Sequence, residues 1–402
     1  MISISEPIIA FLTLLLVWTI VSILAKLFHF KEKYGLTIYP LILIYESETF
    51  TKFINKQSQK NVNFWKKYSK ISGLSTLALA FIAIAYFGLN AYFLLKEKLI
   101  VTSTGVAVGT PVVPIIPFIT IPWNFFAIFL IASALSIIPH EFAHGVVAVN
   151  EGVKIKSTGI FVLFGLILGG YVKLDEEFEK DFEKLFEEKT EKSVRRDISR
   201  KLYKIAGAGL LANILMAIIF FGAIGGLYEK GGVLILSVEE GSPAFKAGLK
   251  TNDVILQIGN DSIRSVSDLQ KVLSKYSPNE TVLVYTDRGV FNLTFGSNPA
   301  NDSRAYMGIS IWDYYKFKMG KLDKNTELML YLMLNIIFIL QITIMLLNAL
   351  PLYITDGAKA ILAYLISKNI NPQTALKFYN LINIIGLTML ALNISISLPL
   401  LG

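Results

Sequence analysis

The amino-acid sequence predicts a polytopic α-helical membrane protein that also contains membrane-embedded β-hairpin elements and an inserted β-rich domain. Three observations lead to this fold class. Hydrophobic residues make up 53% of the 402-residue chain and charged residues only 17%, whereas soluble domains carry about 25% charged residues. The apolar residues cluster in stretches of roughly twenty, the length that crosses a bilayer core. Residues 228–325, by contrast, are mostly polar with short β-like runs.

Six apolar stretches are long enough to span a membrane, and we expect about six transmembrane helices. They cover residues 7–28, 71–95, 123–149, 202–227, 328–350 and 374–398. The formal charge is 38 − 30 = +8, but the basic residues are dispersed around the spans. This distribution favours contact with the lipid bilayer and argues against a nucleic-acid partner. The sequence has no cysteine, which excludes disulfides, cysteine–zinc sites and thiol catalysis.

Two apolar segments are too short or too irregular to be spanning helices. Residues 158–172 are rich in glycine and β-forming residues, which predicts strands or a hairpin dipping into the membrane. Such backbone can lie at membrane depth only if protein covers it or it lines a cavity. Residues 99–122 contain four prolines and are expected to form an extended loop. The densely charged segment 175–201 predicts a solvated or interfacial helix.

The lysines of the first loop set the expected orientation. Residues 29–70 carry eight lysines and three glutamates, whereas residues 96–122 carry only two lysines. Because loops rich in Lys and Arg stay in the cytoplasm, we expect residues 29–70 inside and the N-terminus outside. Alternation then places residues 228–325 and the C-terminus outside, and residues 351–373 on the cytoplasmic side.

Two of the three histidines lie in the motif His140-Glu-Phe-Ala-His144. Residues i and i+4 of a helix are about 40° apart, so both imidazoles project from one face. This geometry suits two nitrogen ligands of one zinc ion, with Glu141 close enough to handle a proton on bound water. The alternative is a hydrogen-bonded histidine cluster at the membrane interface. The remaining histidine, His29, lies beside two lysines at the end of the first span and is expected to be interfacial.

A catalytic zinc site normally has three protein ligands and an open position, so the third ligand should be a carboxylate. Asp356 follows the fifth predicted span, and the expected topology places it at the same cytoplasmic boundary as the two histidines. The alternative is that Asp356 caps a helix over residues 357–368.

A run within residues 228–325 resembles a known peptide-binding domain. The segments Gly241-Ser-Pro-Ala-Phe-Lys-Ala-Gly-Leu249 and Asp253-Val-Ile-Leu-Gln-Ile-Gly259 resemble a PDZ domain of the type attached to prokaryotic proteases. The resemblance implies that an extended peptide segment binds to a sheet edge. The alternative is a folded spacer whose groove is not used.

The combination of motifs resembles the site-2 protease family of intramembrane zinc metalloproteases. The chain has HExxH in one span, Asn348-x-x-Pro-x-x-x-x-Asp356-Gly after a later span, and the PDZ-like insert between them. Three features look most similar to the branch that contains the eukaryotic sterol-regulatory protease. They are the N-terminal pair of spans, the segment "GLTIYP" at 35–40, and the segment "VVPIIPFITIPWN" at 112–124. The cysteine-rich insertion of that branch is missing.

This resemblance implies a role for each matched residue and one catalytic Zn²⁺. His140, His144 and Asp356 would be the metal ligands, Glu141 the general base, and Asn348 the group that holds the substrate carbonyl or oxyanion. Asn348 as a simple helix–helix hydrogen-bonding group is the alternative. The family's Gly-Pro-x-x-Asn is present as Gly209-Leu-Leu-Ala-Asn213. Because the proline is replaced, the role of Asn213 stays open. The Gly169-Gly170-Tyr171 run matches the family element that presents the substrate strand.

We therefore expect a zinc metalloendopeptidase that cleaves the transmembrane segments of single-span, membrane-tethered proteins, in the plasma membrane of an archaeon-like prokaryote. Its expected regions are an N-terminal two-span region, the first half of the protease core, the PDZ-like domain and the second half of the core. They cover residues 1–98, 99–227, 228–325 and 326–402. Two other functions are considered: a catalytically silent peptide-binding scaffold, and a transporter, which would require inverted internal repeats that the sequence does not show.

Overall fold

The computed structural model describes most of the chain and divides it into two compact units. The described residues are 5–39, 41–100, 112, 123–163, 167–187, 190–298, 301–320 and 322–397. The first unit consists of residues 1–218 and 336–402, and the second of residues 219–335. Helices α7 and α10 each contribute residues to both units.

Five helices in the described part of the chain are long and apolar enough to cross a membrane. They are α4 (Val62–Ile100), α5 (Trp123–Asn150), α7 (Lys192–Leu227), α10 (Lys324–Ala349) and α12 (Pro372–Ser397). The prediction of a multi-pass integral membrane protein is thus confirmed. Helix α7 begins ten residues before the predicted span, within the segment expected to be interfacial, and the charged part of that segment also forms α6 (Glu176–Lys184).

The first of the six predicted spans corresponds to helix α1 (Ser5–Leu27). Its side chains are described from residue 15 onward, and Leu15–Leu27 is an apolar helix shorter than a bilayer span. Crossing of the membrane by α1 therefore stays a prediction. The loop expected at residues 99–122 lies largely outside the described residues.

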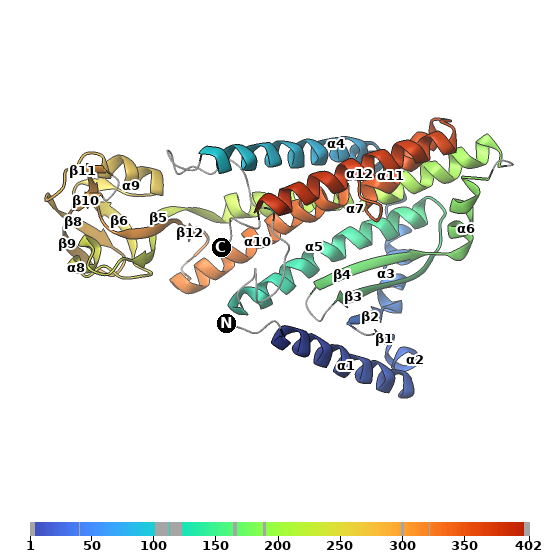
Figure 1. The fold of residues 1–402 in the computed structure, drawn as a ribbon, viewed down its shortest axis with the longest axis horizontal. Helices are drawn as coiled ribbons and strands as arrows, with labels where there is room; N and C mark the ends of the chain where they lie inside the picture. Colours follow the sequence, from blue (N-terminus) through green and yellow to red (C-terminus); the bar gives the residue numbers. More distant parts are fainter. Residues whose placement is uncertain are drawn as a thin grey trace. The chain divides into compact units, whose positions relative to one another are not determined.

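A four-stranded antiparallel sheet joins two segments that are far apart in the sequence. Its order is β1 (Leu36–Tyr39), β2 (Ile42–Glu46), β3 (Ile155–Leu163) and β4 (Ile167–Leu174). The hairpin predicted near residues 158–172 is present as β3–β4, and strand β2 pairs with β3 from Ile42–Leu163 to Glu46–Gly159. In Figure 1 the hairpin runs along α5, which contacts β4.

Short helices connect this sheet to the spans. Helix α2 (Phe30–Tyr34) ends at Gly35, which has a left-handed φ of 66° and approaches the Glu46 carbonyl so closely that a Cβ atom would clash with it. Helix α3 (Glu48–Ser58) begins at Ser47, whose hydroxyl accepts a hydrogen bond from the Phe50 N–H at 3.1 Å. These two caps define where the chain enters and leaves the β1–β2 hairpin.

The core of the first unit lies where the helices α4, α5, α6, α7, α11 (Asp356–Ser367) and α12 meet. Its buried members are small or aliphatic for the most part, which lets the helix backbones approach closely. Examples are Ala143 and Val147 of α5, Ala208 of α7, and Leu362 of α11. This packing places the beginning of α11 and the middle of α7 against the HExxH turn of α5.

The second unit is built around one sheet with the order β12-β5-β6-β8-β9, in which β7 also pairs with β6. The remaining elements are the hairpin β10–β11 and the short helices α8 and α9. The bounds are β5 (Tyr228–Val238), α8 (Pro243–Ala247), β6 (Val254–Ile258), β7 (Asp261–Ser262), α9 (Val266–Leu273), β8 (Thr281–Thr286), β9 (Val290–Thr294), β10 (Gly296–Asn298), β11 (Asn301–Tyr306) and β12 (Ile309–Phe317). Its core is separate from that of the first unit and includes Ile235, Ile255, Leu269 and Phe295.

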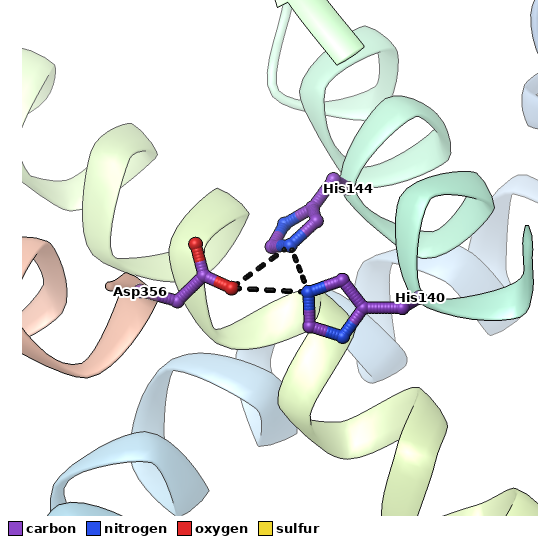
Figure 2. A group of neighbouring side chains, drawn as sticks. All are labelled: His140, His144 and Asp356. Carbon is purple, nitrogen blue, oxygen red and sulfur yellow. Dashed lines mark hydrogen bonds and ion pairs between the residues drawn. The ribbon is translucent and has the colours of Figure 1, made fainter. Parts of the chain in front are cut away.

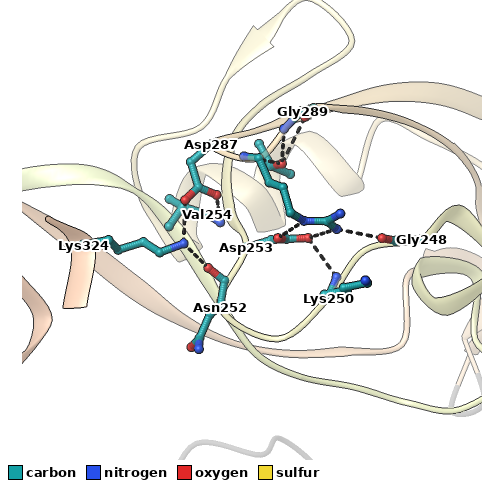
Figure 3. Close-up of polar contacts among 10 residues, drawn as sticks. Gly248, Lys250, Asn252, Asp253, Val254, Asp287, Gly289 and Lys324 are labelled. Carbon is teal, nitrogen blue, oxygen red and sulfur yellow. Dashed lines mark hydrogen bonds and ion pairs between the residues drawn. The ribbon is translucent and has the colours of Figure 1, made fainter.

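A buried carboxylate organises the loops of the second unit (Figure 3). Arg288 donates two hydrogen bonds of 2.7 Å to Asp253, which is 3% exposed, and a third of 2.8 Å to the Gly248 carbonyl. Asp253 also accepts a hydrogen bond from the Lys250 N–H at 2.8 Å. Lys324, at the start of α10, forms an ion pair of 2.6 Å with Asp287. The network therefore links the "Ala-Gly-Leu" turn to the β8–β9 hairpin and to the first residue of α10.

Candidate metal centre

Helix α5 presents His140 and His144 one turn apart, directly after a proline. Pro139 has no N–H, so the carbonyl of Leu135, four residues earlier, lacks its helical partner. The side chain of Gln341 on α10 donates a hydrogen bond of 3.2 Å to that carbonyl. The carbonyl left free by the proline thus forms a hydrogen bond that connects α5 to α10, about one turn before the first histidine.

Asp356 reaches the histidines because the chain turns sharply between α10 and α11. The Thr355 hydroxyl donates to the Leu350 carbonyl at 2.7 Å and accepts from the Leu352 N–H at 3.1 Å, which fixes the turn. A Cβ atom at Gly357 would lie 2.1 Å from the Ala349 carbonyl oxygen, so only glycine allows this approach. The predicted alternative for Asp356 is wrong: Thr355 occupies the N-cap position, and Asp356 is the first helical residue.

Three ligand atoms of these residues meet at one point (Figure 2). The Nε2 atoms of His140 and His144 are 3.0 Å apart, and each is 3.1 Å from the same Oδ2 atom of Asp356. The two histidines are 5% and 9% exposed, so the group is buried between α5 and α11. The structure thus brings together the three residues that the sequence predicts to be metal ligands.

The second ring nitrogen of His144 is fixed by the backbone of α7. Nδ1 lies 2.7 Å from the carbonyl oxygen of Ile205. Because a carbonyl oxygen can only accept, Nδ1 donates this hydrogen bond, which leaves Nε2 as the ring nitrogen that could bind a metal. This arrangement orients a metal-binding imidazole in many metalloenzymes. The buried Nδ1 of His140 has no hydrogen-bond partner among the described residues.

The residues present fit a zinc ion. Tetrahedral zinc with bonds of about 2.0–2.1 Å has ligand atoms roughly 3.3 Å apart, close to the 3.0–3.1 Å separations observed here. The backbone of α7 also leaves space beside the ring nitrogens: a Cβ atom at Gly209 would lie 2.4 Å from Nε2 of His144 and 2.5 Å from Nε2 of His140. These distances are far shorter than van der Waals contact, so a side chain at residue 209 would clash with both rings and occupy the space beside their nitrogens.

A cavity of about 610 Å³ opens next to the three ligands. Glu141 and the half-buried Asn348 line it together with the ligands, so the structure brings both predicted functional residues to the same cavity. One wall is strand β4, whose backbone packs directly against the general-base candidate: a Cβ atom at Gly170 would lie 2.6 Å from Cγ of Glu141. Their catalytic roles are considered below.

Helix α4 holds the α7 segment that supports the site. The Tyr68 hydroxyl donates to the Ala208 carbonyl at 2.8 Å, and the Ser72 hydroxyl lies 3.0 Å from the Lys204 carbonyl. Lys204 forms an ion pair of 2.8 Å with Glu151 at the end of α5, and Ser69 donates a hydrogen bond to the same carboxylate. Residues 204–208 of α7 are therefore fixed from two sides, next to the Ile205 carbonyl that orients His144.

Sequence reasoning missed these supporting residues and left one residue open. Lys204 lies in the predicted span 202–227 and Glu151 just past the predicted span 123–149, and only the three-dimensional fold brings the two side chains together. Asn213, whose role the sequence left open, is completely buried one turn beyond Gly209, and neither polar atom of its amide has a hydrogen-bond partner among the described residues. Two features of the sequence pointed to it: its position in the family's Gly-Pro-x-x-Asn pattern, and the presence of a polar residue inside a predicted span.

The comparisons with known proteins address the family directly. Residues 128–392, which contain both ligand motifs, match the model of Peptidase family M50. The chain belongs to this family. The prediction of a zinc metalloprotease family of the site-2 protease type with a PDZ-like domain is thereby confirmed.

The similar proteins are prokaryotic. The chain is 28% identical over 183 residues to an uncharacterized protein, MJ0971, of Methanocaldococcus jannaschii. The aligned region covers 45% of this chain and 44% of that protein. It is 30% identical over 135 residues to the "Putative zinc metalloprotease" of Treponema pallidum, covering 31% and 30% of the two chains. Less than half of each relative is therefore matched. The expected likeness to the eukaryotic sterol-regulatory branch finds no support in these relatives.

The inserted domain has relatives of its own. It is 46% identical over 54 residues to the serine protease Do-like HtrA of Lactococcus lactis, a match that covers 13% of each chain. The PDZ domain of an SdrC-like protein from Listeria monocytogenes matches 20% of this chain and 87% of that structure at 19% identity, with a TM-score of 0.19. The second unit is a β-rich, PDZ-like region.

Proposed function

We propose that this protein is an intramembrane zinc metalloendopeptidase that cleaves the transmembrane segment of single-span membrane proteins. The observation that carries the proposal is the cavity that holds the His140–His144–Asp356 cluster, Glu141 and one face of strand β4 together. A metal-ligand cluster, a proton-transfer group and a backbone edge are the three parts that peptide hydrolysis requires.

Strand β4 is the feature that suits a transmembrane substrate. A transmembrane helix hides its carbonyls in its own hydrogen bonds, so it must unwind before a peptide bond can be attacked. Strand β4 ends the four-stranded sheet, and its residues Leu168–Val172 line the cavity. An unwound substrate can therefore add to this edge as a fifth strand, and its backbone then runs past Glu141.

The chemistry follows from where the side chains lie. A bound zinc ion supplies a Lewis acid that polarises the scissile carbonyl and acidifies water. Glu141, which lines the cavity beside the ligands, accepts the proton of the attacking water and delivers it to the leaving nitrogen. Asn348 donates its amide N–H to the developing oxyanion. Asp356 supplies negative charge and a hard oxygen ligand that hold the cation between the two imidazoles.

The PDZ-like region supplies a site for a peptide segment. Strand β12 ends its sheet and pairs along its length with β5 alone among the described strands, and α9 contacts β12. An edge strand beside a helix provides the backbone groups and the side-chain wall that peptide addition uses. We propose that this groove selects substrates outside the membrane while the active site faces the cytoplasmic side. The biological role is then regulated intramembrane proteolysis of a tethered factor.

The proposal is tested by cleavage of a single-span substrate by the purified full-length protein in proteoliposomes. Glu141→Gln is expected to keep its zinc, measured by metal analysis, and to lose at least a hundredfold in cleavage rate, because general-base catalysis contributes roughly 10²- to 10⁴-fold. A chelator should abolish cleavage, and added Zn²⁺ should restore it. The matched control is His29→Gln, which removes the histidine that lies outside the cavity and should leave zinc content and rate unchanged.

A catalytically silent scaffold gives a different result. In that case the wild-type protein binds the substrate without cleaving it, and Glu141→Gln behaves as the wild type does. Cleavage that persists in both Glu141→Gln and chelator would contradict the proposed chemistry altogether.

A further inference from the structure

A second cavity, of about 380 Å³, lies between the end of helix α1 and strand β1, and the proposed function does not use it. Its lining combines two lysines with apolar and hydroxyl side chains. These residues are Ser22, Ile23, Ala25, Lys26, Lys31, Leu36, Thr37, Ile38 and Tyr39. None of them lines the cavity of the metal centre.

The two lysines give this cavity a positive charge. Lys26 lies in the last turn of α1 and Lys31 in α2, and both are exposed. Within the described part of the chain neither forms an ion pair. The neighbouring Lys33, by contrast, lies over the ring of Tyr34 at 5.1 Å and does not line the cavity. Two unpaired cations at one cavity favour an anionic ligand.

The surroundings of the cavity are those of a lipid-facing segment. Leu16 and Leu27 of α1, and Phe28 directly after it, are each more than 60% exposed. A lipid environment removes the free-energy cost of exposing these apolar side chains to water. The indole N–H of Trp18 donates to the Tyr39 carbonyl, and Tyr39 is itself half exposed. Trp and Tyr side chains are typical of the headgroup level of a bilayer. The lysines lie where an apolar helix ends, which is the position expected for contact with lipid phosphates if α1 enters the membrane.

We propose that this cavity binds the phosphate headgroup of an anionic phospholipid. Lys26 and Lys31 neutralise the phosphate, while the apolar side chains of Ile23, Leu36 and Ile38 contact the glycerol backbone and the adjoining acyl chain. A soluble phosphate would satisfy the lysines but would leave this apolar wall uncovered. Ile23 lines the cavity and is also 53% exposed on α1, which favours a lipid instead.

Trp18 allows a direct measurement of occupancy. The full-length protein with Trp65, Trp123 and Trp312 replaced by Phe keeps Trp18 as its one tryptophan. It is reconstituted in phosphatidylcholine with increasing fractions of phosphatidylglycerol whose acyl chains carry bromine, a fluorescence quencher. Quenching is expected to saturate at a much lower fraction of the anionic lipid than of brominated phosphatidylcholine. Each lysine near an anionic headgroup contributes roughly fivefold, so Lys26→Gln with Lys31→Gln should weaken the binding by roughly 25-fold.

The matched control is Lys33→Gln, which removes the same charge from the same segment and should change the binding less than twofold. Zinc content reports whether each variant is folded, and Lys26→Arg with Lys31→Arg should retain binding if the charge is what matters. Equal quenching by both brominated lipids, or an equal loss in Lys33→Gln, would overturn the proposal. Displacement of the brominated lipid by millimolar inorganic phosphate would also overturn it, because the ligand would then be a soluble anion. These readouts do not depend on proteolysis, so they stand apart from the proposed enzymatic activity.

Discussion

Gly209 decides whether a metal can enter between the two histidines. Its missing side chain leaves free the space about 2.4–2.5 Å from both Nε2 atoms. Near the end of the same helix, Gly222 has no such neighbour: a Cβ atom there would meet nothing within 4 Å. Since Ala normally stabilises a helix relative to Gly, the two positions allow a clean comparison.

We therefore predict that Gly209→Ala abolishes zinc binding, while Gly222→Ala keeps it and leaves the helix as stable or slightly more stable. The reason is steric: the added methyl group would lie far inside van der Waals contact with both ring nitrogens, where the metal would bind. The measurement is zinc per chain after purification, together with thermal unfolding in detergent. Stoichiometric zinc in Gly209→Ala would show that the metal is held elsewhere.

Asp253 makes the stability of the PDZ-like region depend on pH. Burial alone would raise the pKa of its carboxyl group, but the hydrogen bonds from Arg288 and from the Lys250 N–H, with the nearby charges of Arg288 and Lys324, hold that pKa below its usual range. Because the pKa is lower in the folded state than in the unfolded state, the stabilisation is present above about pH 4 and is lost as the pH falls through the folded value.

The expected result is a PDZ-like region that loses stability steeply below pH 4 in the parent protein and only weakly in Asp253→Asn. At neutral pH that variant should be less stable by roughly 1–3 kcal/mol, because a buried hydrogen-bonded acceptor is impaired. Hydrogen exchange of the β6 backbone amides measures this in the full chain. The control is Asp261→Asn, which removes an exposed ion pair with Lys275 and should retain the parent's pH profile.

At the scale of elements, helix α4 lies outside residues 128–392 that match the family, yet it fixes the α7 segment beside the metal ligands. The ion pair between Lys204 and Glu151 adds a second connection, and it is largely buried. One turn earlier, Lys201 forms an ion pair of the same length, 2.8 Å, with Asp197, whose side chain is 64% exposed. The helix thus offers a coupled pair and a surface pair for comparison.

Lys204→Met is expected to lower the affinity for zinc by about tenfold, whereas Lys201→Met should have almost no effect. Loss of Lys204 leaves the Glu151 carboxylate buried without its cation, and we expect the Ile205 carbonyl that orients His144 to shift as a result. Contacts that orient a metal ligand in this way affect metal affinity by roughly 10- to 100-fold. Ion pairs on the surface, such as Lys201 with Asp197, contribute little to stability. Competition with a chromophoric chelator measures the affinity. Adding Glu151→Gln to Lys204→Met should restore part of it, and equal losses in the two lysine variants would refute the coupling.

The sequence was sufficient for the elements whose information is local. The HExxH spacing predicts a shared helix face, and the glycine-rich, β-forming run near residues 158–172 predicts strands; both are found. The partner of that hairpin could not be predicted, because the pairing of residues 42–46 with 159–163 depends on packing against α5 rather than on any local pattern. The ion pair between Lys204 and Glu151, and the contact of Gly209 with the two histidine rings, could not be predicted for the same reason. The meeting of Asp356 with the histidines could be foreseen only because loop charge placed both at one membrane boundary.

For the whole molecule, the distribution of lysines predicts a definite orientation in the membrane. Residues 29–70 hold eight lysines, and residues 96–122 hold two, so the first loop should lie in the cytoplasm and the PDZ-like region outside. This orientation is what makes the proposed role coherent. Cleavage near a cytoplasmic boundary releases a tethered factor into the cytoplasm, while the outer region selects which substrates are admitted.

Single cysteines test this orientation cleanly because the chain has none of its own. With a membrane-impermeant maleimide on intact cells, Lys98→Cys and Ser267→Cys should be labelled, whereas Lys60→Cys should be labelled only after the membrane is permeabilised. A cysteine at Ser3 reports on α1, and it should be labelled from outside if that helix crosses. The reverse pattern at residues 60 and 98 would place the metal centre toward the outer face. Cleavage there would release the factor away from the cytoplasm, so an inverted topology would exclude the regulatory role even if every residue of the zinc site acted as proposed.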